Sequence, residues 1–118
     1  MTTSAASIAR LIVSVSSVDT ALEFYRGILG LELAKSVGGF AWLSTADGIE
    51  LLLHERESSP SDTAVAIGFV VDDVEGMVVR WRGRGGTIMQ QAAAQPWGET
   101  MAVVRDRDGH VVCLSNRR

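Results

Sequence analysis

The sequence predicts an α+β protein made of two βαβββ modules in tandem. Two observations support this fold class: the same order of hydrophobic patterns occurs twice, and each half holds one amphipathic helix that ends at glycine. With 118 residues, 47% hydrophobic and 21% charged, the chain is expected to form one globular domain over residues 1–118. The modules span about 7–55 and 64–116, and the polar segment 56–63, which contains a proline, joins them.

The first module is predicted to contain one helix and four strands. "SIARLIVSVS" is rich in β-branched residues and indicates a strand over 7–16. "SVDTALEFYRGILG" has apolar residues at helical spacing and predicts a helix over 17–30, with Ser17 as N-cap and Gly30 as terminator. Three short strands are expected to follow, over about 31–36, 40–45 and 49–55.

The second module repeats this order. "AVAIGFVV" predicts a strand over 64–71. The helix over 72–86 begins with Asp72 and Glu75 at capping-box spacing and ends at the pair Gly85 and Gly86. The expected remainder is a strand over 87–90, a long turn over 91–99, and strands over 100–106 and 110–116.

This arrangement predicts a cleft. One helix per module covers one sheet face, so the helices lie outside and the other faces form a curved mixed sheet around a groove. Ala66 and Gly68 share one face of the fifth strand, and Ser14 lies on the first. Side chains this small cannot fill a concave surface, so water, a partner strand or a ligand is expected there.

Composition excludes several classes of protein. Cys113 is the only cysteine, so neither an intrachain disulfide nor a cysteine-based zinc cluster is expected. A net charge of −3 argues against nucleic acid as a partner. The sequence shows no signal peptide and no apolar run long enough to span a bilayer, so we expect a cytoplasmic protein without membrane contact.

A carboxylate at the start of an apolar strand needs an explanation. In "DGIELLLHERE", Ile49, Leu51 and Leu53 mark the buried face, while Glu50 and His54 lie on the other. Glu50 either reaches water at a rim or faces a cavity where a cation, a donor or a ligand meets it. His54 is interpreted as a rim residue.

The three tryptophans differ in their expected roles. Trp81 belongs to the apolar stripe of the second helix and is expected in the core. Trp42 fits either the core or a cavity wall. Trp97 lies in a loop between Pro96 and Gly98, where it either stacks on a planar ligand or fills a dimer interface.

Two other side chains have unremarkable predicted roles. His110 follows a turn glycine and is expected to be solvated. Cys113 lies within the last strand, where we expect a small packed thiol, because no neighbouring base is evident to activate it.

The segments "ALEFYRGILGLEL" and "VRDRDGHVVCL", in this order and in a duplicated frame, resemble the glyoxalase/bleomycin resistance/extradiol dioxygenase group, also called the vicinal oxygen chelate superfamily. The resemblance covers essentially all of residues 8–116. The "QPWGE" segment at 95–99 is similar to the metal-free, antibiotic-binding branch.

In the enzymes of that family, four strand positions hold a divalent metal. The matching positions here are Arg10, Glu50, Ala66 and Cys113, a set with one cation and one methyl group. The resemblance therefore implies a protein without a metal or other cofactor. Glu50 would pair with Arg10, or would stay at a solvated cavity mouth with Arg10 pointing outward.

The resemblance implies a homodimer that binds a small, planar or cationic organic molecule, as in antibiotic resistance by sequestration, with no catalytic residue. The expected ligand-binding residues are Arg10, Ser14, Trp42, Glu50, Ala66, Gly68, Trp97 and Cys113. One alternative is a lyase, isomerase or epimerase that uses a metal or an acid/base pair at Glu50. Another is a regulatory module whose groove is filled by its dimer partner.

Overall fold

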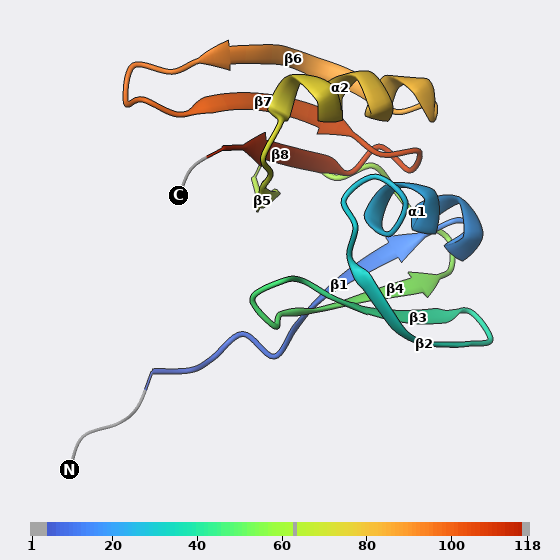
Figure 1. Ribbon diagram of the computed structural model, residues 1–118. Helices are drawn as coiled ribbons and strands as arrows, with labels where there is room; N and C mark the ends of the chain where they lie inside the picture. The colour runs from blue at the N-terminus through green and yellow to red at the C-terminus, as the bar shows by residue number, and fades with distance from the viewer. Residues whose placement is uncertain (1–4, 63, 117–118) are drawn as a thin grey trace.

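A computed structural model describes residues 5–62 and 64–116 of the chain (Figure 1). The first module contains β1 (Arg10–Val15), α1 (Val18–Tyr25), β2 (Glu32–Val37), β3 (Phe40–Ser44) and β4 (Glu50–Glu55). The second contains β5 (Ile67–Val70), α2 (Val74–Gly83), β6 (Thr87–Ala94), β7 (Thr100–Arg105) and β8 (Val111–Ser115). The predicted α+β class and the tandem βαβββ order are confirmed.

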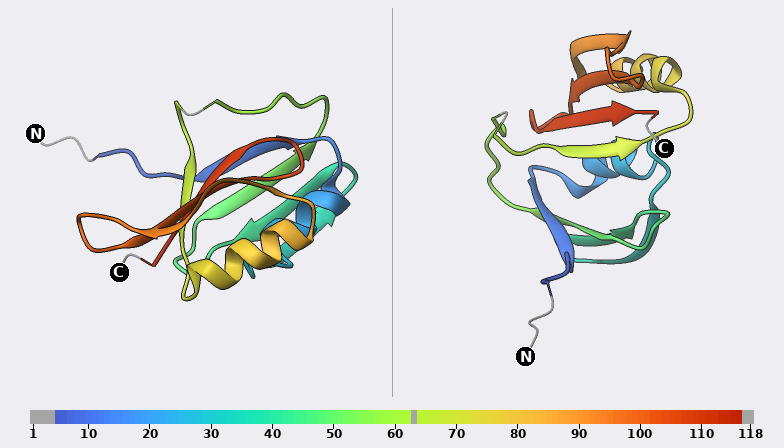
Figure 2. Two further views of the ribbon diagram at one scale, coloured as in Figure 1. Left: turned by 90° about the horizontal axis from the view of Figure 1, so that it is seen from above. Right: turned by 90° about the vertical axis from the view of Figure 1, so that its left-hand side faces the viewer.

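Each module forms its own four-stranded mixed sheet with the same topology. Sheet A has the order β1-β4-β3-β2 and sheet B the order β5-β8-β7-β6, and each first strand runs parallel to the last strand of its module. The two sheets lie on opposite sides of α1, and α2 packs against β6 and β7 (Figures 1 and 2). The structure therefore consists of two sheets with the same strand order, and the first helix lies between them.

The helices begin and end where capping chemistry requires. Ser17 caps α1 by accepting a hydrogen bond from Thr20 N, as predicted. The cap of α2 is Asp73 rather than the predicted Asp72, because the helix begins one residue later, at Val74. The chain leaves the two helical segments through Gly30 and Gly85, whose φ angles of 75° and 88° suit glycine.

Several predicted boundaries are wrong. The first helix was expected over 17–30, but it ends at Tyr25 with Arg26 as C-cap, and turns lead from there to Gly30. The second was expected over 72–86 and ends at Gly83. The segment 91–94 was expected to be a turn, but it continues β6, because Ala93 and Ala94 pair with Met101 and Thr100 of β7. The turn is confined to 95–99 and is closed by the bond from Gly98 N to Gln95 O. The fifth strand starts at Ile67, so Ala66 lies just before it.

An aromatic cluster joins the helices in the core. The rings of Phe24 and Trp81 meet edge to face at 4.9 Å, and both side chains are fully buried, as predicted for Trp81. Trp81 Nε1 donates to the carbonyl of Arg105 at 2.7 Å. A Cβ atom at Gly86 would lie 2.2 Å from the Trp81 ring, so only glycine fits at this position.

The two modules are also held together by a buried polar contact. Tyr25 in α1 donates its hydroxyl hydrogen to Asp106 Oδ2 at 2.7 Å, and the backbone N–H groups of Asp108 and His110 donate to the other carboxylate oxygen. Ser16 N in turn donates to Asp108 Oδ1. The turn at 106–110, between β7 and β8, is thus fixed to the end of β1 and to α1.

Neither described helix is long or apolar enough to cross a bilayer.

Replacing Tyr25 by Phe is expected to lower the free energy of unfolding by about 1.5–3 kcal/mol, because a buried carboxylate loses its side-chain donor. Urea denaturation followed by circular dichroism measures the change. Val79→Ala, at an exposed position of α2, is the control and should stay within about 0.5 kcal/mol. A Y25F variant as stable as the wild type would contradict the structural role of this contact.

The same contact predicts a loss of stability in alkali. Burial, and then the Asp106 carboxylate, raise the pKa of Tyr25 well above its usual value. The stabilisation is therefore complete below about pH 10 and is lost as pH rises further, because the unfolded tyrosine ionises first. Tyr25 is the only tyrosine, so Y25F should lack this component of the decline above about pH 10. Parallel curves for the two proteins would contradict the prediction.

Candidate functional site

The face of sheet A that points away from α1 is the first candidate site, and we call it the open face. Along β1, Val13 and Val15 are buried in the core, while Ile12 is 58% exposed. Strand register places the outward residues of three strands in rows. These rows are Arg10–Glu50–Ser44, Ile12–Leu52–Trp42 and Ser14–His54–Phe40.

The first row contains an ion pair at two of the four family ligand positions. Arg10 Nε lies 2.6 Å from Glu50 Oε2, with side chains that are 48% and 35% exposed. The N–H direction does not meet hydrogen-bond geometry, so the contact is ionic, and Oε2 is a buried atom without a hydrogen-bond partner among the described residues. At this exposure the pair contributes little to stability. Its consequence is chemical: a fixed cation faces the carboxylate.

The other two rows hold aromatic rings. Phe40 stacks on His54 at 4.3 Å and on Trp42 at 5.7 Å, with interplanar angles of 22° and 23°. Lys35 Nζ lies 5.3 Å from the Trp42 ring centroid, within cation–π range. All three rings are partly exposed. Trp42 therefore lies on the open face and outside the helix-packed core, and it forms a flat surface with its two neighbours.

The family's divalent metal does not fit this donor set. A metal needs three or more converging N, O or S donors, and no such group of His, Cys, Asp or Glu occurs within residues 5–62 and 64–116. Glu50 already faces the guanidinium of Arg10, and Ala66 offers only a methyl group. The residues present are those of an ion pair.

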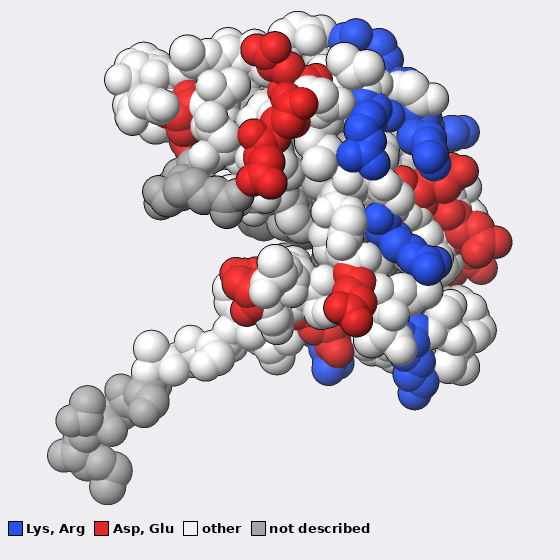
Figure 3. Space-filling model, in the orientation of Figure 1, with Lys and Arg blue, Asp and Glu red and all other residues white. Residues whose placement is uncertain are grey.

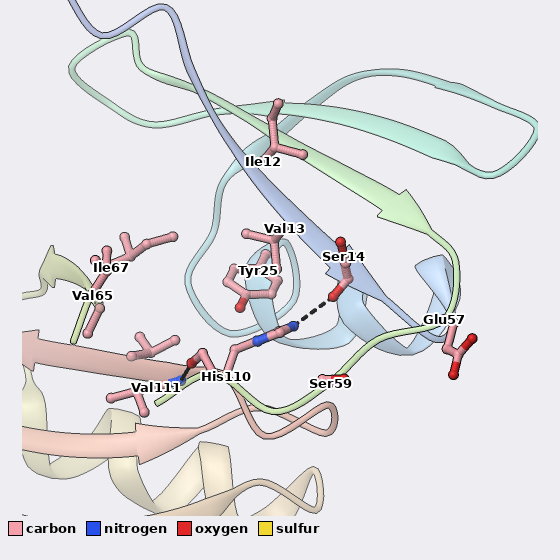
Figure 4. A pocket seen from close by; sticks show the side chains of 13 residues that line it. Ile12, Val13, Ser14, Tyr25, Glu57, Ser59, Val65, Ile67, His110 and Val111 are labelled. Atoms are coloured by element: carbon pink, nitrogen blue, oxygen red, sulfur yellow. Dashed lines mark hydrogen bonds between the residues drawn. The ribbon is translucent and has the colours of Figure 1, made fainter. Parts of the chain in front are cut away.

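A second candidate site is a cavity of about 390 Å³ between β1 and β5, which we call the β1–β5 cavity. Ile12, Val13 and Ser14 line one side, and Val65, Ala66 and Ile67 line the other. Figure 4 shows His110 extending from the start of β8 toward β1, where its Nε2 meets the carbonyl oxygen of Ser14. This cavity is separate from the ion pair, because neither Arg10 nor Glu50 lines it.

A larger hollow of about 660 Å³ lies between the β3–β4 turn and β5. Gly68 and Val70 line it on one side, and Thr45, Asp47 and Ile49 on the other. Figure 3 shows the molecule hollowed between the two modules. This hollow is broad, and its only predicted site residue is Gly68.

The structure places the eight predicted ligand-binding residues in different parts of the molecule. Arg10, Glu50 and Trp42 share the open face, and Ser14 and Ala66 line the β1–β5 cavity. The other three residues lie in the second module: Gly68 opposite Cys113 in the β5–β8 register, and Trp97 at the tip of the β6–β7 hairpin. The pairing of Arg10 with Glu50 is confirmed as a contact, while ligand binding by these residues stays a prediction.

Trp97 and Cys113 have distinct surroundings. Trp97 is 66% exposed and donates its indole N–H to Glu99 Oε1 at 2.5 Å, so the ring is held on the hairpin surface. Cys113 is half-buried, and a Cβ atom at Gly68 would lie 3.9 Å from its Cβ. The missing side chain at Gly68 leaves space beside the thiol.

The sequence analysis missed His110, which was expected to be solvated. Its ring is half-buried, and Nε2 lies 2.7 Å from Ser14 O and 3.3 Å from Ser58 Oγ. The turn glycine before it gave no signal of this role, because the contact arises only when turn 106–110 packs on β1. Asp106, four residues earlier, is a partial signal of this role, because its carboxylate accepts a hydrogen bond from the backbone N–H of His110.

Comparison with known proteins identifies the class of this fold. The family model described as the glyoxalase/bleomycin resistance protein/dioxygenase superfamily matches residues 7–114. The chain belongs to this superfamily, which confirms the resemblance drawn from the sequence at the level of the superfamily. A search of curated proteins finds no match.

Solved structures share the fold at low sequence identity. A glyoxalase-related enzyme from Fulvimarina pelagi is 19% identical, with a TM-score of 0.80 over 92% of this chain and 86% of that one. A family enzyme from Burkholderia phytofirmans PsJN is 17% identical, with a TM-score of 0.81 over 93% and 98%. An integron cassette protein from the mobile metagenome of V. cholerae is 21% identical, with a TM-score of 0.69 over 98% of both chains. At these identities the likeness concerns the fold alone.

The donor set predicts that protein purified without chelators contains no stoichiometric transition metal, because Arg10 faces the one carboxylate among the family ligand positions. Inductively coupled plasma mass spectrometry measures the metal content, and EDTA-treated protein serves as the reference. One equivalent of zinc, nickel or iron that EDTA removes would contradict the prediction.

Proposed function

We propose that this chain is a metal-free small-molecule-binding protein of the superfamily, with the ligand on the open face of sheet A. The observation that carries the proposal is the contact between Arg10 and Glu50, which puts a guanidinium where the family's enzymes coordinate a metal. Sequestration of a toxic compound, as in bleomycin-type resistance, is the cellular role that we infer.

The chemistry of the open face favours a planar ligand with a hydrogen-bond donor. Trp42, Phe40 and His54 present stacked, partly exposed rings on which a flat molecule can lie. Arg10 covers Glu50 Oε2, but the Glu50 side chain is 35% exposed, so a donor on the ligand would meet its other carboxylate oxygen. Arg10 already neutralises this carboxylate, so a donor group matters more than a full positive charge.

The remaining predicted contacts belong to the same proposal. Trp97, Ala66 and Gly68 lie away from the open face, so ligand contact by these three residues is a separate part of the proposal. A homodimer and a cytoplasmic location are proposed with it. A groove filled by the dimer partner is the competing arrangement, and it predicts that no small molecule binds to the open face.

An enzyme is the second candidate, and one observation favours it. The partly exposed carboxylate of Glu50 would accept a proton from a bound substrate, with the adjacent Arg10 stabilising the negative charge that develops on the substrate. This arrangement would suit an isomerase, epimerase or lyase that works without a metal. It requires turnover as well as binding.

Isothermal titration calorimetry with 6-aminoquinoline, quinoline and bleomycin tests the binding proposal. We expect 6-aminoquinoline to bind more tightly than quinoline, because only the former can donate to Glu50. W42A should weaken 6-aminoquinoline binding about tenfold, since ring stacking contributes on the order of 1.4 kcal/mol. E50A, which has no side-chain acceptor at this position, should remove the preference for the amino compound.

Matched variants separate the parts of the proposal. W97A removes an aromatic ring from the other module, and an unchanged Kd would exclude Trp97 without affecting the open face. The proposed site would be contradicted if quinoline and 6-aminoquinoline bind the wild type with the same Kd and W42A does not change either Kd. Tight binding of bleomycin alone would support sequestration, and chemical change of a ligand would favour the enzyme.

A further inference from the structure

The β1–β5 cavity contains a histidine whose tautomer the structure determines. His110 Nε2 lies 2.7 Å from the carbonyl oxygen of Ser14, and a carbonyl oxygen only accepts hydrogen bonds. Nε2 must therefore carry the hydrogen. In the neutral ring Nδ1 is then an acceptor, and it makes no hydrogen bond to any residue that the structure describes.

The ring is held firmly in this orientation. Ser58 Oγ also donates to Ser14 O, at 2.8 Å, and lies 3.3 Å from Nε2. The backbone N–H of His110 donates to Asp106, which is itself fixed by Tyr25. Contacts from three segments of the chain thus determine where Nδ1 lies.

The rest of the cavity wall is mostly apolar and carries a few polar side chains. Branched side chains from both modules form the apolar part: Ile12, Val13, Val65, Ile67, Val111 and Val112. The polar groups beside His110 belong to Ser14, Tyr25, Ser59, Ser61 and the exposed Glu57. None of the described lysines or arginines lines the cavity.

We propose that the β1–β5 cavity is a second ligand site, which takes a compact branched aliphatic molecule with an amine or hydroxyl head group. The head group donates a hydrogen bond to His110 Nδ1, and the branched tail packs against the valine and isoleucine side chains. An acidic or acceptor-only ligand is disfavoured, because a carboxylate and an imidazole acceptor line the cavity, while the neighbouring Arg56 and Arg105 already donate to Ser14 Oγ and Ser61 O. This site does not depend on the proposed function of the open face.

Three probes with the same branched skeleton test the chemistry: 3-methylbutan-1-amine, 3-methylbutan-1-ol and 3-methylbutanoate. Each is titrated at pH 8 into isotope-labelled protein and followed by NMR at the methyl groups of Val65, Ile67 and Val111. The amine and the alcohol should shift these signals saturably, at the millimolar affinities usual for such small ligands. The carboxylate should not. Absence of shifts with the amine and the alcohol, or equal binding of the carboxylate, would overturn the proposal.

Two variants of His110 separate the acceptor from the structural contact. H110Q retains an amide N–H near the position of Nε2, so it keeps the bond to Ser14 and loses the Nδ1 acceptor. It should fold normally and bind the amine about fivefold to tenfold more weakly. H110N places its amide oxygen near the position of Nδ1, so it should retain binding with a lower unfolding free energy. Wild-type affinity in H110Q, or loss of binding in folded H110N, would overturn the assignment.

Long-range proton–nitrogen NMR correlations of the His110 ring provide an independent readout. Without ligand, the pattern should be that of the Nε2–H tautomer, and the Nδ1 signal should move when the amine binds. The Trp42 indole signal should stay unchanged, because Trp42 lies on the open face and does not line the cavity. Movement of Trp42 without His110 would place the amine on the open face and overturn the proposal.

Discussion

The hydrogen bond between Tyr25 and Asp106 is the buried polar contact among several contacts that hold the two modules together. Each sheet is complete within its own module, since every strand pairs only with strands of the same half. The relative position of the sheets therefore depends on α1 and on what binds to it. A buried carboxylate is costly unless it is well paired, so Asp106 strongly favours the arrangement in which Tyr25 and two backbone N–H groups surround it.

Both candidate sites follow from this arrangement. With turn 106–110 held against the end of β1, the free edges of β1 and β5 face each other without pairing, and the space between them is the β1–β5 cavity. The open face of sheet A remains available, because α1 covers only the opposite face. One strand, β1, thus contributes Arg10 to the open face and Ser14 O to the cavity.

Much of the fold could be predicted from the sequence, because the signals that specify it are local and occur twice. Ser17 caps the start of the first helix through its side chain, and Gly30 ends the turns that follow the helix through its positive φ angle. The apolar alternation in "IELLLHE" indicates which face of that strand is buried. The error at 91–94 has a physical cause. "QAAA" has weak β propensity, and β7 alone holds it in the sheet through cross-strand pairing.

The candidate sites were predictable only where one module contains the whole contact. Arg10 and Glu50 lie opposite each other in the β1–β4 register, so family spacing was enough to bring them together. His110 and Ser14 are 96 residues apart in the chain and meet only through the packing of the modules. No local sequence pattern indicates a contact between residues so far apart in the chain, so the sequence predicted only an ordinary turn residue at His110.

The Arg10–Glu50 contact also shows how this fold can change its chemistry. A metal ion offers exchangeable coordination sites, whereas a guanidinium offers a fixed charge with N–H donors only. With this pair in place, the binding that we propose on the open face would depend on aromatic stacking and hydrogen bonding. Glu50 is the one carboxylate in its row, so the metal-free reaction proposed as the alternative would use it as a proton acceptor or as a nucleophile.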